Sequence, residues 1–401
     1  LMKTLSIDIE TYSDVPLQKA GVYRYVESPD FEILLFAYSI DNQPVQVIDL
    51  ACGEQIPKEI LLALEDECVI KWAFNATFER ICLSRFLGYP TGEYLKPKSW
   101  RCSMIWSATM GLPLSLEGVG AVLGLEKQKL SEGKDLIKYF CQPCAPTKAN
   151  GQRTRNRPFH APDKWAMFKK YNIRDVETEM GIQQRLAKFP VPAQIWDEYH
   201  LDQEINDRGI MLDMAVVENA IAFDEKSKAS LMIAMQNITN LDNPNSVAQM
   251  KQWLSENGIE AESLGKKDVA AMIKDTNGDI ANALKLRLQL AKSSVKKYQA
   301  MQNAVCNDGR LMVCFSFTVP IVPGVGLADL FSCKIYRKII FLILQMHVRL
   351  FVLVIMICCS FYMMIIPDTL SQLIRTAFIA KPGYKFIVSD YSAIEARALS
   401  H

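Results

Sequence analysis

Two acidic motifs near opposite ends of the chain constrain what it can fold into. The first is SIDIETYS (Ser6–Ser13), and the second is VSDYSAIEAR (Val388–Arg397). In each motif, a short apolar run typical of a strand brings acidic residues to its end. Asp8 and Glu10 are two residues apart, so both side chains point to the same face of a strand. Carboxylate oxygens suit hard cations such as Mg²⁺. The sequence therefore predicts two metal-dependent sites that act on phosphate esters.

The composition limits the class of protein. At 401 residues the chain is too long for one ordinary core, which predicts two or three domains. A formal net charge of +1 argues against binding nucleic acid by bulk charge, whereas local basic patches can still bind it. The 11 cysteines follow no disulfide framework, and the chain begins without a signal peptide. We therefore expect reduced thiols in a cytoplasm, with Met2 as the true start.

One cysteine pair, Cys141 and Cys144, has the CxxC spacing of zinc and redox sites. A zinc site needs a second pair nearby, and His160 is the only neighbouring candidate. A redox site needs a thioredoxin-like strand–helix setting, which the sequence does not predict. We expect a structural or incidental role for this pair.

Strands alternate with helices over the first 190 residues, which predicts an α/β domain. The predicted strands are Lys3–Ile9, Phe31–Ile40, Val45–Leu50 and Cys68–Phe74. The predicted helices are Pro57–Glu65, Phe78–Leu87, Leu116–Leu123, Lys134–Phe140 and Trp165–Leu186. A basic loop, Ala145–Arg157, interrupts this pattern. Prolines in Phe189–Pro192 mark a boundary, and the pattern of Ala193–Asn307 is almost wholly helical.

The helical region contains one strongly basic stretch, Ala281–Gln302, which we expect to be a single helix. It carries Lys285, Arg287, Lys292, Lys296 and Lys297 on an otherwise apolar pattern. Two interpretations stay open, a solvated helix face and a face that tracks phosphates.

The segment Met312–Ile366 differs sharply from the rest of the chain, because it is rich in apolar residues and its only carboxylate is Asp329. Its last part, Leu350–Ile366, has no charge and approaches the length of a membrane span. Arg349 interrupts the longer apolar stretch, and no positive flank or clear aromatic belt accompanies it. We therefore expect no membrane association.

Three segments could together form one catalytic site. Asp8 and Glu10 come from the first strand, Asn75–Glu79 follows a buried strand, and Tyr171 and Asp175 share one face of a helix. Acidic and phenolic groups from three segments could hold two divalent ions on a phosphodiester. One ion would activate water and the other would stabilise the leaving oxygen. The Tyr171 hydroxyl could orient that water beside Asp175.

These segments carry a resemblance to a known family. SIDIETYS, NATFER and YNIRD resemble the three motifs of the DEDDy 3′→5′ proofreading exonucleases, whose domain is ribonuclease H-like. The downstream chain resembles bacteriophage-type family A DNA polymerases. Gln203–Asp213, Asn243–Leu254 and Lys292–Met301 look like thumb-proximal segments, and Leu370–His401 looks like the start of the palm with motif A.

The resemblance implies roles for single residues of the exonuclease. Asp8, Glu10 and Asp175 would be metal ligands, and Tyr171 would position the attacking water. Glu79 is a further catalytic residue at a position where the wider family usually has Asp. Two Mg²⁺ or Mn²⁺ ions would serve each active site, and the partners would be primer-template DNA, a single-stranded 3′ end and dNTP.

For the polymerase, Asp390 would be catalytic and would bind the two metals, with help from the Tyr391 carbonyl. Glu395 would exclude a ribose 2′-hydroxyl, and Arg375 would contact an approaching strand. The further residues that we expect to bind substrate are Asn75, Phe78, Lys292, Lys296 and Lys297.

The sequence as given ends at His401, before the family's nucleotide-binding helix and its second catalytic carboxylate. The resemblance therefore implies that this chain does not polymerise DNA alone and that only exonuclease activity survives. The apolar segment has an explanation in the genetic code: when Val319–Met346 is back-translated, codons can be chosen so that a frame starting one base earlier gives a string that contains the family's GRWAGR element. We infer an out-of-frame segment without a native fold.

The predicted domains are an exonuclease (1–190), a helical thumb or linking region (191–311), the out-of-frame segment (312–366) and the start of the palm (367–401). The predicted function is that of a family A DNA polymerase with a proofreading exonuclease in DNA replication. The alternatives are a stand-alone 3′→5′ exonuclease and a non-catalytic or membrane-attached DNA-binding protein.

Overall fold

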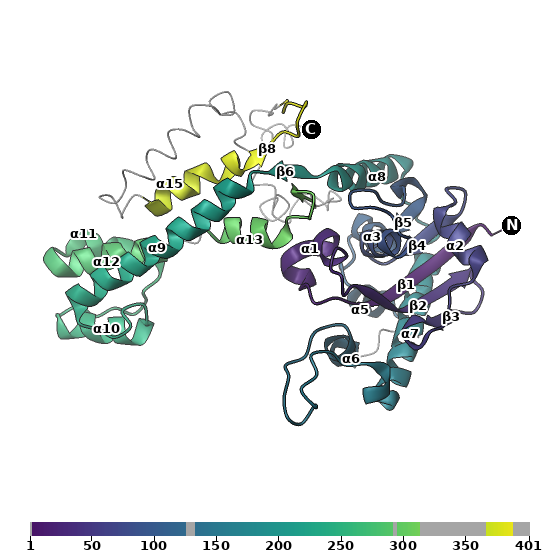
Figure 1. The fold of residues 1–401 in the computed structure, drawn as a ribbon, viewed down its shortest axis with the longest axis horizontal. Coiled ribbons are helices and arrows are strands. Elements are labelled where there is room, and N and C mark those ends of the chain that lie inside the picture. The colour runs from purple at the N-terminus through teal and green to yellow at the C-terminus, as the bar shows by residue number, and fades with distance from the viewer. Residues whose placement is uncertain (1, 126–132, 292–294, 313–365, 388–401) are drawn as a thin grey trace. The chain divides into compact units, whose positions relative to one another are not determined.

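The computed structural model describes residues 2–125, 133–291, 295–312 and 366–387 (Figure 1). These residues form two compact units. One contains residues 2–210 together with the segment that begins at 304, and the other contains residues 211–303 and 366–387. Within the described ranges, no helix is both long enough and apolar enough to cross a bilayer. The uncharged run considered as a membrane span lies outside these ranges up to residue 365.

The first unit is built on a five-stranded mixed sheet with the order β3-β2-β1-β4-β5 (Figure 1). Its strands are β1 (Thr4–Tyr12), β2 (Glu32–Ile40), β3 (Gln46–Asp49), β4 (Ile70–Ala73) and β5 (Trp100–Cys102). β2 runs antiparallel to β1 and β3, β4 runs parallel to β1, and β5 runs parallel to β4. This order, with its single reversed strand, is the ribonuclease H-like arrangement that the resemblance implies.

Alternation along β1 separates its apolar and polar side chains. Leu5, Ile7 and Ile9 are almost fully buried in one hydrophobic cluster. Because successive side chains of a strand point to opposite faces, Asp8 and Glu10 point to the other face. That face contacts the long helix α7 (Pro162–Leu186). A register shift between Glu10 and Thr11 marks a bulge in this ladder, and bulges re-aim side chains next to sites.

Helices cover both faces of the sheet. They are α1 (Leu17–Tyr25), α2 (Lys58–Glu65), α3 (Thr77–Phe86), α4 (Ser103–Thr109), α5 (Leu116–Val122), α6 (Gly133–Phe140), α7 and α8 (Ala193–Arg208). α7 begins with Pro162, where the missing N–H costs no helical bond. Its Phe168 and Tyr171 rings are buried against Leu35 of β2, which fixes the helix on the polar face of β1.

Ionic and polar contacts tie α8 and a returning segment to the first unit. The buried Arg80 guanidinium donates two hydrogen bonds of 2.8 Å to the Asp207 carboxylate. The segment after residue 304 contains the short strand β7 (Arg310–Leu311). Arg310 donates to the Arg208 carbonyl at 2.7 Å, so this segment belongs to the first unit although 93 residues of the other unit precede it.

The second unit is mainly helical, which confirms the predicted helical region after the α/β domain. Its helices are α9 (Met214–Thr239), α10 (Val247–Glu256), α11 (Lys266–Asp275), α12 (Gly278–Leu290), α13 (Lys296–Ala304) and α15 (Ile366–Leu373). Two short strands, β6 (Ile210–Leu212) and β8 (Phe378–Ile379), pair antiparallel. Leu231, Met235, Leu254 and Leu284 form its core.

The prediction of one helix over Ala281–Gln302 was wrong. α12 ends at Leu290, after which the Ala291 N–H donates to the carbonyls of Arg287 and Gln289, and α13 begins at Lys296. The basic residues of this stretch also differ in environment. Lys285 is exposed, whereas Arg287 is buried and donates to the Pro244 carbonyl at 3.0 Å.

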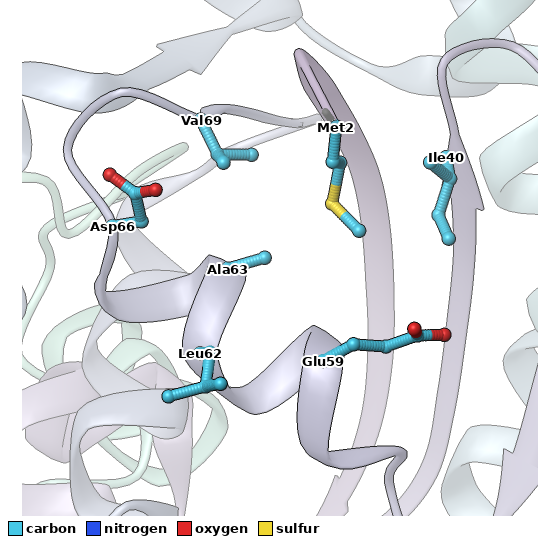
Figure 2. A pocket seen from close by; sticks show the side chains of 7 residues that line it. All are labelled: Met2, Ile40, Glu59, Leu62, Ala63, Asp66 and Val69. Carbon is cyan, nitrogen blue, oxygen red and sulfur yellow. The ribbon is translucent and has the colours of Figure 1, made fainter.

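One hollow of about 360 Å³ lies between α2 and the starting end of β1 (Figure 2). Apolar side chains and two carboxylates line it: Met2, Ile40, Glu59, Leu62, Ala63, Asp66 and Val69. No residue predicted for a catalytic site lines this hollow.

Candidate metal centre

Three carboxylates from two elements converge in the first unit. Asp8 and Glu10 come from β1 and Asp175 comes from α7, and their ligand oxygens all lie within 4.8 Å of one another. Glu10 and Asp175 are buried, whereas Asp8 is half-buried. Like charges so close together repel in a poorly solvated place. The cluster therefore suits a bound cation, because a cation offsets that repulsion.

Tyr171 lies beside these carboxylates on the same face of α7. Its side chain is almost fully buried and stacks on Phe168, with ring centroids 6.0 Å apart. Burial, the nearby charges of Asp175, Glu10 and Asp8, and a hydrogen bond with Asp175 all raise the pKa of Tyr171. The phenol therefore keeps its proton and can donate a hydrogen bond.

Glu79 lies on the first turn of α3 and does not belong to the group of three carboxylates that could share one ion. Burial raises its pKa well above the usual value, and the charges of Asp8 and then Glu179 raise it further. Among the described residues, its Oε2 atom has no hydrogen-bond partner. Glu79 therefore lies close enough to Asp8 for their charges to interact, but it does not belong to the ligand cluster.

The two residues predicted to bind substrate next to Glu79 have different environments. Asn75 is exposed and adopts a left-handed backbone conformation, with φ of 74°, at the turn from β4 to α3. Asn tolerates this conformation better than most residues. Phe78 is half-buried, and its ring packs on Tyr25 with centroids 6.2 Å apart. The predicted contacts of Asn75 and Phe78 with substrate stay predictions.

The structure describes only some of the residues predicted to bind substrate or metal in the polymerase. Lys292, Asp390, Tyr391 and Glu395 lie outside the described residues. Lys296 and Lys297 are exposed on the first turn of α13, and Arg375 is half-buried in a 3-10 turn. Their predicted contacts with DNA stay predictions.

The structure adds residues that sequence reasoning missed. Asn172 donates from Nδ2 to Asp8 Oδ2 at 2.6 Å, which fixes that carboxylate. Cys141 lies with its Sγ 3.8 Å from Glu10 Oε2. A Cβ added at Gly133 would collide with the edge of the Tyr171 ring. Asn172 belongs to the YNIRD motif, so it could have been predicted from the sequence. Nothing in the sequence connects Cys141 or Gly133 to the site.

Among the described residues, neither Cys141 nor Cys144 belongs to a group of side chains that could share a metal ion. The described ligand group contains carboxylates alone, and both thiols are free. Cys144 contacts the Arg153 carbonyl at 3.4 Å, and His160 Nδ1 accepts a hydrogen bond from the Arg157 N–H. These contacts give Cys144 and His160 local structural roles.

The donor set of the cluster fits Mg²⁺ or Mn²⁺, which prefer carboxylate oxygens. Asp8, Glu10 and Asp175 would hold the metal. Two of the ligands come from one strand and the third from a helix that packs on the same face, so the sheet–helix interface fixes their spacing. Such an arrangement can bind a divalent cation against a phosphate ester.

Comparison with known proteins connects this geometry to a class of enzyme. The chain is similar along its whole length to a DNA polymerase. That relative comes from Bacillus phage SP02 and is 46% identical over 420 aligned residues, which cover 100% of this chain. The chain spans 61% of the relative's length. The comparison confirms the predicted resemblance to phage DNA polymerases, whereas no protein-family profile matches the chain.

Solved structures give weaker likenesses. The polymerase domain of Pol1 from M. smegmatis, in complex with DNA primer-template and dNTP, is 14% identical with a TM-score of 0.46. It is matched over 80% of this chain and 50% of that one. NrnC of Brucella melitensis is 12% identical with a TM-score of 0.31, over 50% of this chain and 82% of that one.

Proposed function

We propose that the α/β unit is a 3′→5′ exonuclease that removes nucleotides from the 3′ end of a DNA strand. The observation that carries the proposal is the convergence of Asp8, Glu10 and Asp175 beside a protonated Tyr171. The similarity to a phage DNA polymerase supports DNA as the substrate. In this proposal the exonuclease proofreads for a family A polymerase during replication, with primer-template DNA and dNTP as the polymerase's partners.

The three carboxylates would hold two Mg²⁺ or Mn²⁺ ions, which supply charge stabilisation at the scissile phosphate and lower the pKa of water. Asn172 keeps the Asp8 carboxylate in place through its 2.6 Å hydrogen bond. The Tyr171 hydroxyl, whose proton goes to Asp175, would accept a hydrogen bond from the attacking water and fix its direction. Water adds to phosphorus and loses a proton, the bond between phosphorus and the 3′ oxygen breaks, and that oxygen takes up a proton. The products are a nucleoside 5′-monophosphate and a strand shorter by one nucleotide.

The decisive experiment is digestion of a 3′-labelled single-stranded oligonucleotide by the chain with and without Mg²⁺. We expect release of mononucleotides that EDTA abolishes. Asp8→Ala should lower kcat by at least about 10²-fold, because it removes a ligand of the catalytic ions. Asp135→Ala, on α6, is a matched control that removes an acid outside the ligand cluster. Equal activity of the natural chain and Asp8→Ala would exclude the nuclease.

The stand-alone exonuclease is the second candidate, and the same unit supports it. It predicts that activity survives removal of the chain beyond the first unit. The truncated chain must keep the segment after residue 304, because Asn307 and Arg310 form hydrogen bonds with Glu27 and Arg208. A chain cut after Met312 is therefore the fair test, and a cut before residue 304 would damage the nuclease unit itself.

A further inference from the structure

The basic loop Ala145–Arg157 is a charged surface that the proposed reaction does not use. It carries four cations and no carboxylate, in a chain whose formal net charge is only +1. The cations are Lys148, Arg153, Arg155 and Arg157. In Figure 1 the loop extends away from the end of α6. So much positive charge in 13 residues creates a local field that the rest of the chain does not have.

Hydrogen bonds rather than apolar burial order this loop. The Cys144 N–H donates to the Thr154 carbonyl at 2.8 Å, which closes the base of the loop. Asn150 donates to the Ala145 carbonyl at 2.8 Å, and Arg153 donates from Nε to Asn156 Oδ1 at 2.8 Å. A loop held in this way binds a ligand at a lower cost in conformational entropy than a free one.

The base of the loop contacts the strand that carries two of the carboxylates. The Arg155 guanidinium lies over the Tyr12 ring, 3.7 Å from its centroid, and Tyr12 is two residues beyond Glu10 on β1. Cys141, just before the loop, contacts Glu10 at 3.8 Å. A DNA strand whose 3′ end lies at the carboxylates can therefore contact cations of the loop.

The cations of the loop exceed the acids that could neutralise them. Arg155 and Arg157 both pair with one carboxylate, Glu32, at 2.5 and 3.4 Å. Lys148 is exposed. Partial burial, followed by the charges of Arg153 and Arg157, lowers the pKa of His160. The surplus charge faces solvent, where it can meet an anion.

Two residues beyond the loop extend the same surface. Phe159 is 74% exposed, which is unusual for a large apolar ring. Lys164, on the first turn of α7, lies over the Tyr139 ring at 4.5 Å. Proteins that grip single strands combine cations that track the backbone with aromatic rings on which bases stack. A duplex would offer no unstacked base to Phe159.

We propose that the basic loop, with Phe159 and Lys164, binds the single-stranded DNA that leads to the cleaved 3′ nucleotide. The assignment rests on the proposed exonuclease and names how that site holds its substrate. Lys148, Arg157 and Lys164 contact phosphates, and Phe159 stacks on a base. Arg155 positions the loop on Tyr12 and stays part of the scaffold.

The test compares a charge-removal variant, Lys148→Gln/Arg157→Gln/Lys164→Gln, with the natural chain. Binding of a fluorescent 12-nucleotide single strand is measured by anisotropy in Ca²⁺ at several salt concentrations. We expect Kd to rise about tenfold or more at 0.1 M salt, and the dependence of log Kd on log salt to become shallower, since fewer counterions are released. Phe159→Ala should weaken binding about fivefold or more without changing that dependence.

Two measurements separate this inference from the proposed function. Hydrolysis of the p-nitrophenyl ester of thymidine 5′-monophosphate, which is too short to reach the loop, should be the same in the variant and the natural chain. If the natural chain hydrolyses neither this ester nor DNA, the proposed exonuclease fails while the binding data still report on the loop. The control Lys58→Gln/Lys98→Gln/Lys188→Gln removes three exposed cations elsewhere in the unit and should bind the single strand normally.

Three results would overturn the inference. One is an unchanged Kd in the charge-removal variant, and another is an equal loss in the control, which would indicate bulk charge alone. The third is a loss of affinity for duplex DNA that equals or exceeds the loss for the single strand. In that case the loop would belong to a duplex surface.

Discussion

The ring of Tyr171 occupies the space in which any side chain larger than that of glycine would stand at position 133. A Cβ built on Gly133 would lie 2.7 Å from Cδ2 and Cζ of Tyr171 and closer still to Cε2. Gly133 has no left-handed backbone conformation, so the requirement is for space alone. The glycine thereby sets where the phenol hydroxyl stands relative to Asp175.

Gly133→Ala therefore tests whether the place of Tyr171 matters to the reaction. We expect kcat on a single-stranded oligonucleotide to fall about ten- to a hundredfold, because a small misplacement of a positioning group is costly. Metal affinity, measured by calorimetry, should change little. The matched control is Gly120→Ala on α5, where a Cβ would meet Thr178 at an ordinary 3.5 Å. A kcat within twofold of the natural value would contradict the expectation.

The predicted carboxylate cluster came from periodicity that is visible in the sequence. Asp8 and Glu10 share a face because strands alternate, and Tyr171 and Asp175 share one because helices turn every 3.6 residues. Periodicity gives no information about which distant residue comes to lie beside a face. Cys141 and Gly133 reach the site through tertiary packing, so they could not be predicted.

Among the elements, those with a strong local pattern were predicted, whereas α1 and β5 were missed. β1, β2 and α7 have long, regular patterns and matched. α1 contains Gly21 with φ of 74°, which kinks the helix and disrupts its pattern. β5 has only three residues, and its pairing to β4 defines it rather than its sequence.

The strand β4 carries a buried lysine, and the burial of its charged form is unfavourable. Lys71 is 1% exposed and donates from Nζ to the Asp66 carbonyl at 2.7 Å. Burial lowers its pKa to about 8, and the nearby charges of Asp66 and Glu67 only partly compensate. Below about pH 8 the folded protein therefore holds a charged group in a poorly solvated place.

Lys71→Met should stabilise the protein at pH 7 by about 1–2 kcal/mol, after allowance for the hydrogen bond lost. The unfolded chain binds more protons than the folded one between about pH 8 and the unfolded pKa of 10.5. The stability of the natural protein therefore rises with pH across that window, and the advantage of the variant should disappear by its upper end. Urea unfolding at pH 7 and pH 10 measures this, with Lys58→Met as an exposed control. An advantage that is the same at both pH values would contradict the assignment.

At the scale of the whole molecule, the described chain consists of two compact units with separate cores. Ile7 lies in the core of the first and Leu284 in the core of the second. The predicted boundary at residue 190 stays a prediction. The pattern of prolines did not reveal that α8 and the segment after 304 belong to the first unit. Contacts made by a segment so far along the chain leave no local signal.

Separate cores predict separate unfolding. Ile7→Ala and Leu284→Ala each remove buried methyl groups and should cost about 2–5 kcal/mol. We expect each substitution to accelerate hydrogen exchange only in peptides of its own unit, measured by mass spectrometry in mild denaturant. Faster exchange in both units after either substitution would show that they unfold as one.

The return of residues 304–312 to the first unit has a consequence for synthesis on the ribosome. The three carboxylates have all been translated by residue 175, yet Asn307 and Arg310, which make the closing contacts, emerge only after helices α9 to α13 have been made. A nascent chain thus contains the carboxylates of the proposed nuclease site long before the last contacts of the first unit can form. If the proposed activity depends on that closure, DNA near the ribosome meets a trimming enzyme only once most of this chain has been read.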